Sequence, residues 1–164
     1  MTPCSVPLKN AINLSAATAL GSYLVQQNIN PLLLGPDNES EQWVKQVAQV
    51  GDFDWAVASK QRLSDVEVNI TLPALNFQDR IVVLVDDVIS SGHTVTEVAQ
   101  QLLTAGAAQV CCLVTHALFA EGALALLQQA GIQTIWSSDS IPHESNVIQL
   151  AGMLADSLQA LLEK

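Results

Sequence analysis

Two adjacent carboxylates, Asp86 and Asp87, stand just before the small polar run Ser-Ser-Gly-His-Thr at residues 90–94. Such a run can bind a phosphate through hydroxyl and backbone N–H groups, especially where a helix begins and directs free N–H groups at an anion. Carboxylates beside a bound phosphate suit a phosphorylated sugar, because the sugar hydroxyls and an accompanying Mg²⁺ ion both need oxygen partners. The stretch therefore predicts a binding site for a sugar phosphate.

A strand and a helix are predicted to position these groups. Residues 81–85 are all aliphatic, which is typical of a strand buried on both faces, and the two acids follow its expected end. Thr94 and Glu97 form a capping-box pattern, which predicts that an amphipathic helix over about residues 95–104 begins there. An acid at a strand end and a glycine in the next turn also occur for turn geometry alone, but two acids with two serines and a threonine favour a phosphate site. The stretch lacks the Gly-Lys-Ser/Thr of a Walker loop and the three spaced glycines of a dinucleotide-binding loop.

Residues 86–94 resemble the phosphoribosyl-diphosphate loop of type I phosphoribosyltransferases and ribose-phosphate pyrophosphokinases. Further stretches resemble the pyrophosphokinase family in the same order along the chain: residues 31–37, 59–62, 114–119 and 138–142. The resemblance extends from about Val6 to the last predicted helix. It implies an α/β fold of the type I phosphoribosyltransferase kind.

The resemblance also implies what the chain binds. Pyrophosphokinases of this family transfer the β,γ-diphosphoryl group of ATP to the C1 hydroxyl of ribose 5-phosphate, with Mg²⁺, and so make phosphoribosyl diphosphate. The polar run would hold the 5-phosphate, while the two acids would face the ribose hydroxyls and the metal. The imidazole of His93 is expected to point to solvent while its backbone N–H binds. The implied substrate-binding set is Asp86, Asp87, Ser90, Ser91, Gly92, His93 and Thr94.

Three more residues receive roles from the resemblance. Asp37 would lie beside the diphosphate and bind its Mg²⁺ together with Asp86 and Asp87. Lys60 and Arg62 would be the catalytic cations, neutralising charge on the transferring group, which is the main electrostatic requirement of phosphoryl transfer. These two cations are also close together in a chain with only 6 basic residues.

The chain departs from the family pattern in two ways. Around Asp37 the family usually has glycines followed by an arginine, whereas this chain has Glu39, Glu41 and, at about the arginine position, Trp43. The glutamates put negative charge where a diphosphate should dock. The family's subunit also has two similar domains, and this chain resembles the second, whereas ATP is held mainly by the first and by a neighbouring subunit. The chain alone is therefore expected to bind ribose 5-phosphate or phosphoribosyl diphosphate and to catalyse transfer weakly or not at all.

Alternatives to a pyrophosphokinase domain stay open at this point. A free-standing type I phosphoribosyltransferase would use the same loop, although the 72–80 connection offers no obvious hood for a base. A non-catalytic regulatory subunit that binds the sugar phosphate is favoured by the acidic run after Asp37. A homo-oligomer is compatible with each of these functions.

The remaining sequence predicts alternating strands and helices with short connections. Strands are expected at 31–35, 55–59, 66–71, 81–85, 109–116 and 132–136, and helices at 9–27, from 39 onward, 95–104, 121–130 and 147–161. This alternation predicts a doubly wound parallel sheet in a single domain over residues 1–164. Ligands bind beyond the carboxyl ends of the strands in such sheets. Several candidate residues fall near predicted strand ends and should lie near one another: Asp37, Lys60, Asp86, Asp87, His116 and Asp139.

The composition excludes several classes of partner. With 6 basic and 16 acidic residues the net charge is −10, so most of the surface would repel DNA or RNA, and no nucleic-acid partner is expected. Apolar runs fall short of the ~18 residues of a membrane span, and no signal-peptide pattern opens the chain, so no membrane partner and a cytoplasmic location are predicted. Cys4, Cys111 and Cys112 are too few for a disulfide framework and are predicted to be reduced.

Overall fold

The computed structural model of the chain describes residues 12–62 and 68–163. Within them, six strands form one sheet in the order β2-β1-β5-β6-β7-β8, and each neighbouring pair is parallel. The strands are β1 (Leu32–Gly35), β2 (Trp55–Val57), β5 (Ile81–Ile89), β6 (Gln109–Ala117), β7 (Ile132–Ser138) and β8 (Asn146–Ile148). Since β1 and β5 are parallel neighbours, the residues that follow both strands meet at one edge of the sheet.

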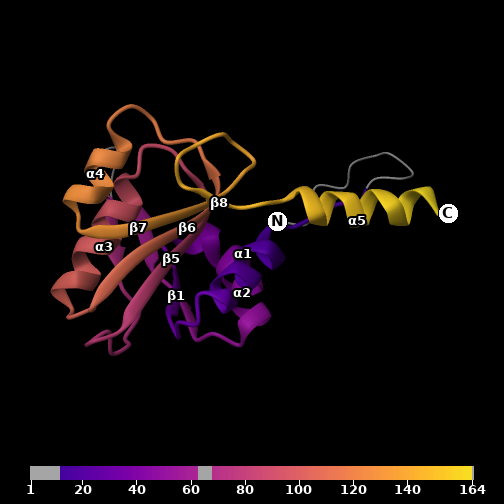
Figure 1. Cartoon of the computed structure of the whole chain (residues 1–164). Helices are drawn as coiled ribbons and strands as arrows, with labels where there is room; N and C mark the ends of the chain where they lie inside the picture. The colour runs from indigo at the N-terminus through magenta and orange to yellow at the C-terminus, as the bar shows by residue number, and fades with distance from the viewer. Residues whose placement is uncertain (1–11, 63–67, 164) are drawn as a thin grey trace.

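Helices cover both faces of this sheet (Figure 1). The pairs are α1 (Ala17–Gln26) with α2 (Glu41–Gly51) on one face, and α3 (His93–Thr104) with α4 (Ala123–Gln129) on the other. Along β5, Val83 packs in the core beneath α1 and α2, whereas Val82 packs in the core beneath α3 and α4. The strand is therefore buried on both faces, as its aliphatic run predicted. The expected α/β fold with a doubly wound parallel sheet is confirmed.

The central strand is longer than the sequence predicted. It was expected to end at Val85, but it continues to Ile89, because β6 runs beside it and pairs with it as far as Ile89 and Ala117. Asp86 and Asp87 consequently lie inside the last part of the strand instead of after it. The backbone at both acids is held in extended conformation by the sheet.

The start of α3 also differs from the prediction. The helix begins at His93 and its N-cap is Gly92, whose φ of 77° lies in the left-handed region. Thr94 is inside the first turn, so the predicted capping box of Thr94 and Glu97 is wrong. The Thr94 hydroxyl instead accepts a hydrogen bond from Lys60 Nζ at 2.9 Å.

Other boundaries shift where one predicted element becomes two. The strand expected at 55–59 divides into β2 of the main sheet and β3 (Ser59–Arg62), which pairs with β4 (Val68–Thr71) as an antiparallel hairpin. The first helix starts at Ala17, residues 12–16 are not helical, and residues 9–11 of the prediction lie outside the described residues. Residues 66 and 67 of the strand predicted at 66–71 also lie outside them.

The last helix, α5 (Ala151–Leu162), projects away from the sheet (Figure 1). It was predicted at 147–161, but residues 146–148 form β8 and the helix follows them. Each residue of α5 is at least partly exposed. Between residues 12 and 62 and between 68 and 163, no helix combines the length and apolar character that crossing a bilayer requires.

The two cysteines within the described residues, Cys111 and Cys112, are buried in β6 and unpaired. This agrees with the reduced state predicted for them. Cys4 lies outside the described residues.

Candidate functional site

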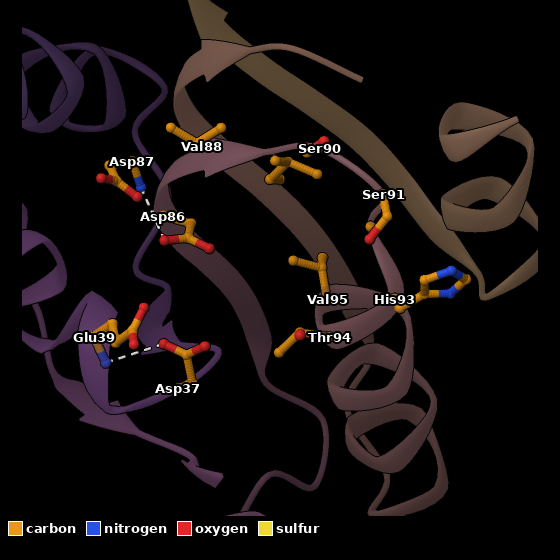
Figure 2. A pocket seen from close by; sticks show the side chains of 12 residues that line it. Asp37, Glu39, Asp86, Asp87, Val88, Ser90, Ser91, His93, Thr94 and Val95 are labelled. Atoms are coloured by element: carbon orange, nitrogen blue, oxygen red, sulfur yellow. Dashed lines mark hydrogen bonds between the residues drawn. The ribbon is translucent and has the colours of Figure 1, made fainter. Parts of the chain in front are cut away.

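A cavity of about 230 Å³ opens at the carboxyl end of β5 (Figure 2). Carboxylates from the strand ends lie on one side of it, and the turn into α3 lies on the other. It is lined by Asp37, Glu39, Asp86, Asp87, Val88, Ile89, Ser90, Ser91, Gly92, His93, Thr94 and Val95. The structure thus brings Asp37 to the two strand acids and the complete polar run, which begin 49 positions later in the sequence.

The turn before α3 has the geometry of an anion site. The first backbone hydrogen bond within the helix runs from Thr96 N to Gly92 O at 2.8 Å. The N–H groups of His93, Thr94 and Val95 therefore lack an acceptor inside the helix, as the first N–H groups of a helix do. Together with the helix dipole they favour a negatively charged ligand.

Two backbone hydrogen bonds from the segment after β6 hold this turn in place. Phe119 N donates to Ile89 O, and Ala120 N donates to Ser90 O, each at 3.0 Å. Gly92 is buried against α4, with Leu127 as its nearest neighbour. The His93 ring is exposed and points away from the carboxylates (Figure 2), in line with the expectation that the imidazole points to solvent.

Replacement of Gly92 by alanine should destabilise the chain. Gly92→Ala is expected to lower the free energy of unfolding by about 1 kcal/mol, because a side chain is strained at a φ of 77°. The new Cβ would also lie 3.3 Å from Leu127 Cδ2. Urea unfolding measures the effect. Gly152→Ala is the matched control, since a Cβ there meets nothing within 4 Å, and equal effects of the two variants would contradict the prediction.

Asp86 is the most perturbed acid of the cavity. Its Oδ1 accepts a hydrogen bond from Asp87 N at 2.9 Å. Burial raises the pKa of Asp86 to about 7, and the negative charges of Asp87 and Asp37 add to the rise. Among the residues that the structure describes, no positive charge offsets this rise at Asp86.

Asp37 has a structural role as well as a place in the cavity. Its Oδ1 accepts from Glu39 N at 3.0 Å and so caps the short 3₁₀ helix η1 (Asn38–Ser40). Ser40, which is fully buried, completes the turn by donating to Asp37 O. The role of Ser40 in this cap was not predicted from the sequence, although its spacing of three residues from Asp37 is a capping signal.

Lys60 connects the two sides of the site. Its Nζ lies 3.5 Å from Asp37 Oδ2 and donates to Thr94 Oγ1 at 2.9 Å. A cation is therefore held between the end of β1 and the start of α3, at the edge of the cavity, where it lines an adjoining hollow with Asp37, Asn38 and Glu39. The catalytic role implied for Lys60 stays a prediction. The side chain of Arg62, the second implied cation, lies outside the described residues.

Two residues expected near the site make structural contacts instead. His116 Nδ1 lies 2.9 Å from Ser140 Oγ, and Asp139 Oδ1 accepts from Leu150 N at 3.0 Å. Neither residue lines the cavity. Glu39 does line it, and Glu41 and Trp43 line an adjoining hollow with Asp87. The negative charge expected from the sequence departure thus lies at the cavity.

Comparison with known sequences agrees with this geometry. The family of phosphoribosyl transferase domains matches residues 9–149. Ribose-phosphate pyrophosphokinases of Methanopyrus kandleri and Methanosarcina acetivorans are 33% and 34% identical, each over 92% of this chain and over 53% and 54% of their own length. The chain therefore spans about half the length of these relatives, and the match is to their C-terminal half.

Solved structures show the same fold. Phosphoribosylpyrophosphate synthetase from Mycobacterium smegmatis superposes with a TM-score of 0.73 at 20% identity, over 90% of this chain and 51% of that one. A purine phosphoribosyltransferase from Pyrococcus horikoshii gives a TM-score of 0.52 at 18% identity, over 79% of this chain and 91% of that one. The sequence match over residues 9–149 establishes that the chain belongs to the phosphoribosyl transferase domain family, with ribose-phosphate pyrophosphokinases among its relatives.

Proposed function

We propose that this chain is a ribose-phosphate pyrophosphokinase domain that binds ribose 5-phosphate and phosphoribosyl diphosphate with Mg²⁺. The observation that carries the proposal is one cavity lined both by the start of α3, whose first N–H groups have no acceptor inside the helix, and by the carboxylates at the end of β5. The N–H groups and the hydroxyls of Ser90, Ser91 and Thr94 would hold the 5-phosphate. The carboxylates of Asp86 and Asp87 would accept hydrogen bonds from the ribose hydroxyls.

The acids of the cavity also fit Mg²⁺. This ion is usually held by one or two carboxylates, with substrate phosphates and waters completing its shell. Asp86 and Asp87, joined by Asp37 across the cavity, supply such carboxylates. Within residues 12–62 and 68–163, no group of three His, Cys, Asp or Glu side chains forms a complete ligand set, and an ion shared with the substrate needs none. A cation bound at this place would lower the raised pKa of Asp86, because a positive charge there would favour the ionised carboxylate.

Lys60 would act on the transferring diphosphoryl group. Bound Mg²⁺ would neutralise part of the negative charge that develops on that group, and Lys60, beside Asp37 and Thr94 at the edge of the cavity, would neutralise another part. Its ammonium is already held by Thr94 and Asp37, so little reorganisation is needed when an anion arrives. Arg62 would supply a second cation. Neither residue needs to remove a proton for this electrostatic role.

The donor ATP would be bound by a partner domain. The relatives are about twice as long as the region they share with this chain. We propose that the chain alone, a single phosphoribosyltransferase-like domain in the cytoplasm, binds the sugar phosphate and is weakly active or inactive in transfer. A homo-oligomer would be one way of presenting ATP to it.

A non-catalytic sugar-phosphate-binding subunit is a second candidate, and Glu39 favours it. The Glu39 carboxylate lines the cavity on the side of Asp37, where the diphosphate would dock, and repels an anion there. The free-standing phosphoribosyltransferase is not favoured, because the relatives that match most of the chain are named pyrophosphokinases.

Calorimetric titration of ribose 5-phosphate into the chain with Mg²⁺ tests the proposed function. We expect a Kd of about 1 mM or tighter, which corresponds to ~4 kcal/mol of binding free energy. Asp86→Ala combined with Asp87→Ala should weaken binding about tenfold, because hydrogen bonds from the hydroxyls and the metal contacts are lost. Asp156→Ala combined with Glu163→Ala removes the same charge from α5 and its C-cap and should leave binding unchanged. An undetectable wild-type signal, or equal effects of both double variants, would overturn the proposal.

A further inference from the structure

The hairpin of β3 and β4 carries Lys60 but is separate from the main sheet. Within the described residues it forms a two-stranded sheet of its own. A two-stranded hairpin is at best marginally stable alone, so its position depends on contacts with the rest of the domain. These contacts therefore determine where the Lys60 ammonium lies.

One face of α3 supplies contacts to the hairpin. Gln101 Nε2 donates a hydrogen bond to Ile70 O in β4 at 3.1 Å. The same nitrogen lies 3.4 Å from Glu97 Oε1, one turn earlier, which helps to orient the amide. The Ile70 side chain is buried in the same core cluster as Val98 and Leu102 of α3. The hairpin is thus attached to α3 by a buried side chain and by a backbone carbonyl.

The strand register connects this attachment to Lys60. Lys60 and Ile70 are directly opposite each other in the hairpin, so their side chains project from the same face. The neighbours Gln61 and Asn69 are exposed, as residues of the other face should be. Gln101 therefore holds the cross-strand partner of the lysine that contacts Asp37 and Thr94 at the edge of the cavity.

The two contacts lie on the same side of α3. Thr94, which accepts the Lys60 hydrogen bond, is seven residues before Gln101, and that separation places two residues on one face of a helix. The N-terminus of this helix also faces the cavity as the anion site. A single helix consequently sets the distance between the bound 5-phosphate and the lysine.

We propose that Gln101 is a positioning residue, which aligns Lys60 with the diphosphate by holding the Ile70 carbonyl. The inference rests on the proposed function, because the diphosphate contact of Lys60 belongs to it. Without the amide, the hairpin keeps its buried Ile70 side chain, but its backbone can shift relative to α3. The lysine then spends less time at the position where an anion meets it, while the turn at residues 90–94 is unaffected.

Titration of the two ligands into Gln101→Leu, with Mg²⁺, tests the inference. Leucine has a similar size and removes the donor to Ile70. Affinity for phosphoribosyl diphosphate should fall about tenfold, which corresponds to one lost charge-assisted contact, while affinity for ribose 5-phosphate should stay within about twofold. Gln100→Leu, at the neighbouring exposed position, is the matched control and should change neither affinity.

Two further variants separate positioning from general stabilisation. Gln101→Asn retains an amide, but its side chain is one methylene too short to reach Ile70 O. It should lower the affinity for phosphoribosyl diphosphate as Gln101→Leu does, without introducing an apolar group. In a Lys60→Ala background, Gln101→Leu should cause no further loss of phosphoribosyl diphosphate affinity, because the residue it positions is absent. Equal loss of both ligands, or an additive loss in the Lys60→Ala background, would overturn the inference.

The outcome also distinguishes this inference from the proposed function. If the wild-type chain binds neither ligand, the proposed function fails, and the inference fails with it. If the wild-type chain binds both ligands and Gln101→Leu keeps the wild-type affinity for phosphoribosyl diphosphate, only the role of Gln101 is wrong.

Discussion

Asp86→Asn is expected to stabilise the ligand-free chain at pH 8 and to leave its stability nearly unchanged at pH 4.5. The pKa of Asp86 is raised to about 7 in the folded chain, first by burial and then by the charges of Asp87 and Asp37. The folded state therefore holds a proton that the unfolded state releases near pH 4, so the wild type loses stability as pH rises from about 4 to about 7. Asparagine is uncharged throughout this range and avoids that loss.

The expected gain at pH 8 is about 2 kcal/mol. A pKa rise of this size corresponds to at most ~4 kcal/mol, and water in the open cavity screens part of it. The amide oxygen of asparagine can still accept the hydrogen bond from Asp87 N, so the change removes charge and keeps the contact. Urea unfolding at both pH values, with a chelator to remove divalent cations, measures the difference.

The matched control for this experiment is Asp156→Asn on the exposed helix α5. It makes the same change in net charge away from the cavity and should alter the unfolding free energy little at either pH. If both variants gained the same unfolding free energy, the effect would come from the overall net charge of −10 and not from the cavity. A loss of stability in Asp86→Asn at pH 8 would show that the ionised carboxylate is favoured in the fold.

Such a cost is understandable if the carboxylate serves a ligand. A buried acid without a counter-charge destabilises the fold, and a bound cation would reverse the effect by favouring the ionised form. Mg²⁺ is therefore expected to raise the stability of the wild type at pH 8 more than that of Asp86→Asn. In the proposed function, the Asp86 carboxylate would lower the stability of the free chain and bind the metal and sugar in the loaded one.

The sequence predicted the fold and most of the cavity because both depend on strong local signals. The aliphatic run before Asp86 specifies a strand buried on both faces, and strands alternating with helices specify a parallel sheet. Parallel strands place their carboxyl ends at one edge, which is why Asp37 and Asp86 line the same cavity. These inferences use composition and order along the chain, which a single sequence supplies.

The features that the sequence did not predict depend on contacts between residues that are far apart in the sequence. The pattern of Thr94 and Glu97 matches a capping box, but a left-handed Gly92 begins the helix and the Thr94 hydroxyl accepts from Lys60, which is 34 positions away. The contact of Gln101 with Ile70 O is of the same kind. Local periodicity likewise predicted α5 without showing that the helix projects from the sheet.

Lys60→Ala is expected to weaken binding of phosphoribosyl diphosphate with Mg²⁺ about thirtyfold and binding of ribose 5-phosphate less than about threefold. Removal of a hydrogen-bonded charge from a partly buried ion pair typically costs ~1.5–3 kcal/mol. The Lys60 ammonium lies between Asp37 and Thr94, and its side chain is 25% exposed, so solvent screens it less than a surface lysine. The effect should concentrate on the diphosphate because, in the proposed function, the N–H groups of α3 would bind the 5-phosphate.

Lys45→Ala is the control that separates the local contact of Lys60 from the long-range effect of losing one positive charge. Lys45 is exposed on α2 and lines the hollow beside Glu39, so its loss changes the net charge equally without removing a contact to the cavity. Calorimetry at two salt concentrations should show a small, salt-sensitive effect for Lys45→Ala and a large effect for Lys60→Ala that persists in salt, since close pairs are screened less than distant ones. Equal effects of the two variants would show that Lys60 acts only through the overall electrostatic field of the chain and not through a local contact. A large effect confined to the diphosphate would instead identify Lys60 as the group that compensates the negative charge of Asp37 and Glu39 when the second anion docks.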